Sequence, residues 1–187
     1  VSSVDNGPVL SIINSTIKNA ETGLKILTTN RFNGRLNLNT VTFDNNNIGA
    51  HFVGPFSMKE YILSDCQFKN GDIGIQVDDF PRNDDPLSTH RAIIFDNIGL
   101  FENQNIGIKC NNTEGITISR NTFTNCVKAI NIFDLKSIPP HVNLLVERNV
   151  LTNISSCGIC IDGLENGSIA NILENTIYGN STFLKSF

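Results

Sequence analysis

A run of acidic and basic side chains between residues 78 and 91 is the part of the sequence best suited to chemistry. The run Asp78-Asp-Phe-Pro-Arg-Asn-Asp-Asp-Pro-Leu-Ser-Thr-His-Arg91 holds four carboxylates, one imidazole and two guanidinium groups. Paired carboxylates act as general acid and general base in the hydrolysis of glycosidic bonds. The candidate catalytic residues are Asp78, Asp84, Asp85 and His90, together with His51 from an earlier part of the chain.

Asp78 and Asp79 also suggest a metal site, because carboxylate oxygens are hard ligands that suit calcium. A bound calcium ion would neutralise a uronate while a histidine, arginine or lysine removes the proton at C5. An ordinary solvated loop explains the same composition, since Asp, Asn, Pro and Ser are common turn residues. The sequence therefore leaves two alternatives for a cofactor, namely none or calcium.

Two further insertions should lie near the 78–91 segment. Residues 53–60 and 133–142 follow the same kind of apolar-x-apolar triplet as 78–91 does, so all three should leave the fold at one corner. Their charged residues are Lys59, Glu60, Asp134, Lys136 and His141. A catalytic site requires the acidic residues and His90 to converge with His51 or His141 around one cleft.

The elements that position these residues repeat along the chain. A small residue precedes each apolar-x-apolar triplet. Before that small residue stand an apolar residue and, two positions after it, an Asn. The spacing between successive repeats suits solenoid coils. The triplet segments are Gly23–Ile26, Gly49–Phe52, Gly74–Val77, Gly107–Cys110, Ala129–Ile132 and Gly158–Ile161. Each coil is too short to bury its own apolar face, so coils must stack. The repeat predicts an all-β fold, a right-handed parallel β-helix (solenoid) of about seven coils.

Period-two alternation assigns an inner and an outer face to the triplet strands. The apolar members, including Leu24, Ile26 and Cys110, should be buried in one stack. Asn121, Asn149 and Asn175 should form a partial side-chain ladder at one bend, because stacked Asn side chains hydrogen-bond to one another. The outward column comprises Lys25, His51, Gln76, Lys109, Asn131 and Cys160.

The repeats resemble a known family. The segments Ile118-Ser-Arg-Asn-Thr-Phe-Thr-Asn125 and Val146-Glu-Arg-Asn-Val-Leu-Thr-Asn153 are similar to the coils of the pectin-lyase-like superfamily of right-handed parallel β-helix proteins. That superfamily includes pectate lyases, polygalacturonases, alginate lyases and epimerases, phage tailspikes and bacterial surface adhesins. The resemblance implies a secreted or cell-surface protein that acts on or adheres to polysaccharide. No Asn-Thr-Asp, Asp-Asp and Gly-His-Gly set of polygalacturonase type is present.

Composition excludes other classes of protein. The formal net charge of −4 supplies no basic field for nucleic acid, and no apolar run approaches the ~18 residues of a membrane span. The odd number of cysteines does not suit a disulfide framework. The C-x-x-C pair Cys157 and Cys160 lacks the βαβ unit or second ligand pair that a redox or metal site needs, so the cysteines are interpreted as small apolar side chains. Cys110 should be buried and unpaired, whereas Cys160 should point outward.

The lack of Trp argues against a dedicated sugar-binding module, and Tyr178 and Phe80 are the aromatic rings left for the surface.

The residues and their repeat leave two functions open. Residues 1–187 are interpreted as a single parallel β-helix domain, a segment of a longer exported protein with further coils or capping elements at both ends. The favoured function is a structural or glycan-adhesive segment of a cell-surface or tail-type protein. The alternative is a polysaccharide lyase, hydrolase or epimerase that acts on acidic polysaccharide at the 78–91 loop.

Overall fold

The chain folds entirely into parallel β-structure in the part that the computed structural model describes. The described residues are 9–27, 35–54, 60–80, 93–113, 115–135, 144–179 and 182–186, and within them every regular element is a strand. The alternation of β-branched, aromatic and polar residues favours this outcome, because one side of each strand is buried and the other faces solvent. The predicted all-β solenoid is confirmed.

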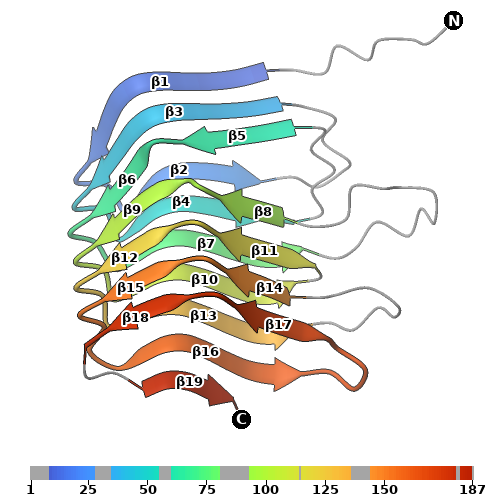
Figure 1. The fold of residues 1–187 in the computed structure, drawn as a ribbon. Coiled ribbons are helices and arrows are strands. Elements are labelled where there is room, and N and C mark those ends of the chain that lie inside the picture. Colours follow the sequence, from blue (N-terminus) through green and yellow to red (C-terminus); the bar gives the residue numbers. More distant parts are fainter. Residues whose placement is uncertain are drawn as a thin grey trace, which may run out of the picture.

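Three sheets run along the stack (Figure 1). Sheet A contains β1 (Val9–Lys18), β3 (Arg35–Asp44), β5 (Glu60–Ser64), β6 (Cys66–Lys69), β9 (Gly99–Glu102), β12 (Thr122–Thr124), β15 (Val150–Thr152) and β18 (Thr176–Tyr178). Sheet B contains β2 (Thr22–Leu27), β4 (Ile48–Val53), β7 (Ile73–Phe80), β10 (Ile106–Thr113), β13 (Lys128–Leu135), β16 (Cys157–Leu164) and β19 (Thr182–Ser186). Sheet C contains β8 (Ile93–Asp96), β11 (Ile116–Ser119), β14 (Leu144–Glu147) and β17 (Ala170–Leu173).

Successive coils pair in register, so each residue lies beside its counterpart in the next coil. Lys109, for example, pairs with Gln76 on one side and with Asn131 on the other. This register reproduces the predicted column of sheet B, but Asn131 and Cys160 in that column are buried, so these two side chains do not reach the surface as predicted. The strand β19 extends sheet B beyond the repeats recognised in the sequence. The right-handed winding and the number of coils stay predictions.

A stack of aromatic rings fills the core beneath sheet A. Phe43, Phe68, Phe101 and Phe123 lie in successive coils, with ring centroids 4.8 Å apart and nearly parallel planes. This separation equals the usual distance between neighbouring strands, so the backbone pairing itself sets the ring spacing. All four side chains are buried.

The small residue before each triplet makes room for these rings. A Cβ on Gly74 would lie 2.7 Å from Cδ1 of Phe101 and 2.6 Å from the carbonyl oxygen of Gly107. The same relation holds between Gly107 and Phe123. Ala stands at the equivalent position 129, and there the ring position of the next coil is filled by Leu151 rather than by Phe. Gly therefore stands before the triplet wherever a Phe ring is the neighbour one coil further on.

The predicted asparagine ladder is present at the bend between sheets C and A. Asn121, Asn149 and Asn175 occupy the same position in three coils, and each of the last two accepts a hydrogen bond from the backbone N–H of the Asn before it. The Asn149 amide also donates to the carbonyl of Ile118 at 2.9 Å. Asn121 and Asn149 are buried, so these bonds satisfy backbone groups that water cannot reach.

A second, exposed ladder marks the corner between sheets A and B. Asn45 donates to Asn19, and Asn103 donates to Asn70, each at 2.9 Å. These residues have φ between 54° and 59°, the left-handed region that Asn tolerates better than most residues. The Asn two residues after each stacked Phe therefore makes the turn.

The core is complete in the middle of the stack and thinner at its first coil. The expected inward residues of β4, β7, β10, β13 and β16 are buried. Leu24 and Ile26 of β2 were expected to be buried but are only partly so, because β2 is the edge strand of sheet B and has a neighbour on one side only.

Replacing Gly74 with Ala should destabilise the fold by about 1–3 kcal/mol, because the added methyl group overpacks the core. The double variant Gly74→Ala/Phe101→Leu recreates the pairing of Ala129 with Leu151. It should therefore lose less stability than the two single changes summed. Urea denaturation of the four proteins measures the coupling free energy. Strict additivity would show that the ring does not determine the choice of Gly.

Replacing Asn149 with Ala should cost on the order of 2–4 kcal/mol, since each buried group left without a partner costs about 1–3 kcal/mol. The change removes the partners of the Asn121 N–H and the Ile118 carbonyl. Asn171→Ala is the matched control, because Asn171 is only partly buried in β17. Equal urea midpoints for the two variants would contradict a structural role for the ladder.

Candidate functional site

The outer face of sheet B presents two adjacent columns of mostly polar side chains. Parallel in-register pairing aligns them, since residues two apart on a strand share a face. The first column runs through Lys25, His51, Gln76, Lys109, Asn131 and Cys160. The second runs through Leu27, Val53, Asp78, Asn111, Phe133 and Asp162. The side chains of these two columns on β4, β7, β10, β13 and β16 are called the sheet B strip below.

His51 and Asp78 meet within this strip. His51 Nε2 lies 2.7 Å from Asp78 Oδ2, although the two residues come from neighbouring coils, on β4 and β7. Gln76 donates to the same oxygen from its Nε2 at 2.5 Å. The His51 and Asp78 side chains are only 13% and 18% exposed. The pair is thus partly shielded from water and stays at the surface.

The chemistry of the pair follows from its hydrogen bond. An ionised carboxylate only accepts, so the Nε2 of a neutral His51 must carry the proton. Nδ1 is then the basic nitrogen of the ring. A carboxylate held against an imidazole fixes its tautomer and stabilises the imidazolium that forms when the ring takes a proton. The arrangement can therefore act as a general base.

Asp79 belongs to a different structural feature. It lies at the corner after the outward strip with a φ of 52°, and its Oδ1 accepts a hydrogen bond from the Asn112 amide at 2.8 Å. Asp134 occupies the equivalent corner of β13, with a φ of 48°. Asp79 therefore takes part in a corner ladder of the same kind as the one that the Asn residues form.

The calcium hypothesis for Asp78 and Asp79 gains no third ligand from the described residues. Within those ranges no group of three or more His, Cys, Asp or Glu side chains could hold a metal ion. Asp78 is engaged by His51 and Gln76, and Asp79 by Asn112. A calcium site here would need oxygen ligands from elsewhere, and the hypothesis stays a prediction.

The remaining predicted site residues lie outside the described part of the chain. These residues are Lys59, Asp84, Asp85, His90, Lys136 and His141. The structure therefore brings together one pair of the candidate catalytic set, His51 and Asp78, well inside the ~6 Å over which charged groups influence one another. The boundaries of the two longer insertions change as well, because β7 extends to Phe80 and β13 extends to Leu135.

The structure adds Phe133, which the sequence pattern places in an insertion. Phe133 pairs with Asn111 and Asp162 on the outer face of sheet B and is partly exposed. Its position two residues after the outward Asn131 was the signal that could have identified it. The structure leaves Tyr178 61% exposed, as expected, whereas the side chain of Phe80 is outside the described set.

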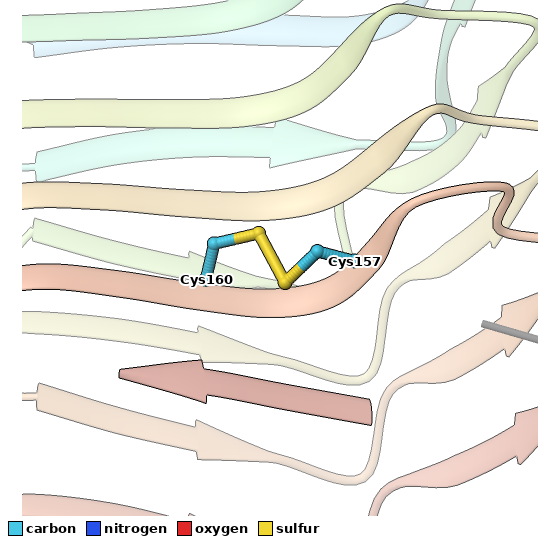
Figure 2. The surroundings of a disulfide bond; sticks show 2 residues. All are labelled: Cys157 and Cys160. Carbon is cyan, nitrogen blue, oxygen red and sulfur yellow. A yellow bond between two sulfur atoms is a disulfide. The ribbon is translucent and has the colours of Figure 1, made fainter. Parts of the chain in front are cut away.

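The cysteines fall into two groups. Cys110 is buried and unpaired as predicted, as are Cys66 and Cys126. Burial raises the pKa of the Cys126 thiol to about 11, and it raises the pKa of the Cys66 and Cys110 thiols as well. The expectation of a free, outward Cys160 is wrong, because Cys160 forms a disulfide with Cys157 (Figure 2).

A second charged surface, at the bend between sheets C and A, is internally neutralised. Asp96 accepts hydrogen bonds from Arg120 Nε at 2.7 Å and from Ser119 Oγ at 2.6 Å. The hydrogen bond from Arg120 is the largest cause that lowers the pKa of Asp96. Arg148 pairs in the same way with Glu174 one coil further on. These pairs leave less unbalanced charge for a ligand than the sheet B strip does.

Comparison with known proteins identifies no relative. No protein-family model, curated protein or solved structure matches the chain. In the described ranges no helix is long and apolar enough to cross a membrane. The fold alone therefore defines the class of protein, a parallel β-solenoid.

Proposed function

We propose that this chain is a glycan-binding β-solenoid segment of an exported cell-surface or tail-type protein. The observation that carries the proposal is the sheet B strip, in which hydrogen-bonding side chains lie beside a partly exposed aromatic ring. Sugars present hydroxyl groups around a ring whose faces carry C–H bonds. Such ligands suit sites that combine a few well-placed polar groups with an aromatic surface.

The polar members of the strip offer complementary hydrogen-bonding groups. Gln76 and Asn111, both partly exposed, each carry a donor and an acceptor, Lys109 donates, and Asp162 accepts. These four side chains are fixed on the strands of one sheet, so a ligand that lies across the coils meets them without ordering a loop. A chain of repeating units can therefore contact the strip over several coils.

The resemblance of the repeats to the pectin-lyase-like superfamily supports the same conclusion. Its members most often act on or adhere to polysaccharides outside the cell, which also favours a secreted or cell-surface location. Fold analogy is an argument about class only. The proposal therefore depends chiefly on the strip, and membership of the superfamily is part of what is proposed.

A second candidate function is catalysis on an acidic polysaccharide, and the contact between His51 and Asp78 favours it. A lyase or epimerase needs a base for the proton at C5 of a uronate, and a carboxylate-oriented imidazole can serve as one. Asp84, Asp85 and His90 from the 78–91 segment stay candidate partners. Calcium stays a candidate cofactor, because it would neutralise the uronate carboxylate.

Binding is tested on a panel of acidic and neutral polysaccharides, with polygalacturonate, alginate, xylan, mannan and glucan as probes. Phe133→Ala and Lys109→Ala should each weaken binding at least about ten-fold, equivalent to ~1.4 kcal/mol. Tyr178→Ala and Lys18→Ala are the matched controls, because these residues lie on sheet A, and they should leave affinity unchanged. Isothermal titration calorimetry measures the affinities. No binding to any glycan, or equal losses in the controls, would contradict the proposal.

The catalytic candidate makes a different prediction. Polygalacturonate and alginate are incubated with the protein in calcium chloride or in EDTA, and new reducing ends, unsaturated uronates and C5-epimerised residues are measured. His51→Gln and Asp78→Asn should abolish turnover and leave binding within a few-fold. Asp44→Asn is the matched control, since Asp44 lies on β3 of sheet A and outside the strip. Binding without turnover would reject the enzyme and leave the adhesive function in place.

A further inference from the structure

The Cys157–Cys160 disulfide occupies a bend that the fold imposes on every coil. Three steps along a straight strand span about 10 Å, yet the Cα atoms of Cys157 and Cys160 are 6.0 Å apart. Pairing between β13 and β16 passes directly from Cys157 to Ile159 and omits Gly158. Pairing of the earlier strands omits the equivalent residues, Gly107 and Ala129. The closeness of the two positions is thus a property of the repeat and does not require the bond.

The bond is also unnecessary for the pairing of its own strand. Cys157 pairs with Lys128 and Thr182, and Cys160 pairs with Asn131 and Lys185, so β16 is held on both sides by backbone hydrogen bonds. In the preceding coil Lys128 and Asn131 fill the same two positions without any covalent link. The stabilisation that a disulfide provides falls as the loop it closes becomes shorter, and this one joins residues three apart.

The other cysteines are poor competitors for exchange. Cys66, Cys110 and Cys126 are buried at 0–1% exposure, and burial raises the pKa of each thiol. The thiolate is the nucleophile in disulfide chemistry, so these three groups react slowly while the protein is folded. Cys160 is 8% exposed and Cys157 is 2% exposed. Cys160 is therefore the more exposed residue of this largely buried pair.

We infer that Cys157 and Cys160 form a reversible thiol–disulfide exchange site that accepts two electrons from a dithiol without unfolding of the β-solenoid. A thiolate of the dithiol attacks Cys160 Sγ, the Cys157–Cys160 bond breaks, and Cys157 leaves as a thiolate that takes up a proton. The second thiolate of the reductant then displaces Cys160 from the mixed disulfide, and Cys160 takes up the second proton. The dithiol ends as a disulfide, and the protein ends with two thiols.

Native protein is equilibrated with reduced and oxidised dithiothreitol in a series of ratios, quenched in acid, labelled with a maleimide and analysed by mass spectrometry. Two labels should appear together, map to Cys157 and Cys160, and disappear again when oxidised dithiothreitol is in excess. Circular dichroism and the urea midpoint should stay nearly constant throughout. The variant Cys157→Ser/Cys160→Ser is the control, and it should acquire no labels under native conditions.

Two single variants test the assignment of the attacked sulfur. Cys157→Ser leaves Cys160 as a free thiol, and Cys160→Ser leaves Cys157. The first protein should react with a maleimide several-fold faster than the second, because Cys160 is the more exposed residue. Reduction that occurs only in urea concentrations that unfold the protein would overturn the inference. Failure of oxidised dithiothreitol to close the bond in the native protein would overturn it as well.

Discussion

Backbone hydrogen bonding between coils that pair in parallel and in register is the constraint on which the rest of the structure depends. It sets each side chain beside the residue at the same position in the next coil, about one strand spacing away. Each position of the repeat must therefore hold residues that can pack against a residue of the same kind in the next coil. Stacked Phe rings satisfy this requirement, and so do Asn side chains that donate to the Asn of a neighbouring coil. A column of like charges would not satisfy it.

The same constraint explains why the charged column on sheet A is mixed. On the outer face of sheet A, Lys18, Asp44, Lys69 and Glu102 follow one another in successive coils, so opposite charges alternate. Lys69 and Glu102 lie 3.8 Å apart. Exposed pairs of this kind contribute little to the free energy of unfolding. Their alternation chiefly avoids the repulsion that identical charges in register would produce.

The inner half of this structure is well predicted by the sequence, and the outer half less so. The alternation of apolar residues identifies most buried positions, and the Asn residues identify the ladder at the bend, because inward side chains and turns obey local rules of spacing and backbone conformation.

Burial of Leu24 and Ile26 is overestimated, because burial at the edge of a stack depends on neighbours that a repeat pattern does not count. Phe133 falls in an expected insertion because the repeat pattern ends each strand at the apolar-x-apolar triplet, whereas the structure continues β13 to Leu135. The disulfide is missed because strict alternation places residues three apart on opposite faces of a strand, whereas the bend at Gly158 brings the two cysteines together.

The division between the two halves has a functional consequence. Core and corners carry the residues that hold the coils together, so the outward positions of sheet B can differ from coil to coil at little cost in stability. Along one axis the strip changes from imidazole and carboxylate at His51 and Asp78 to amides, then to the ring of Phe133 and the disulfide of β16. A ligand that is itself a repeating chain would meet different chemistry at each step. Under the proposed glycan-binding function, recognition on this surface would therefore depend on the order of the coils as much as on any single residue.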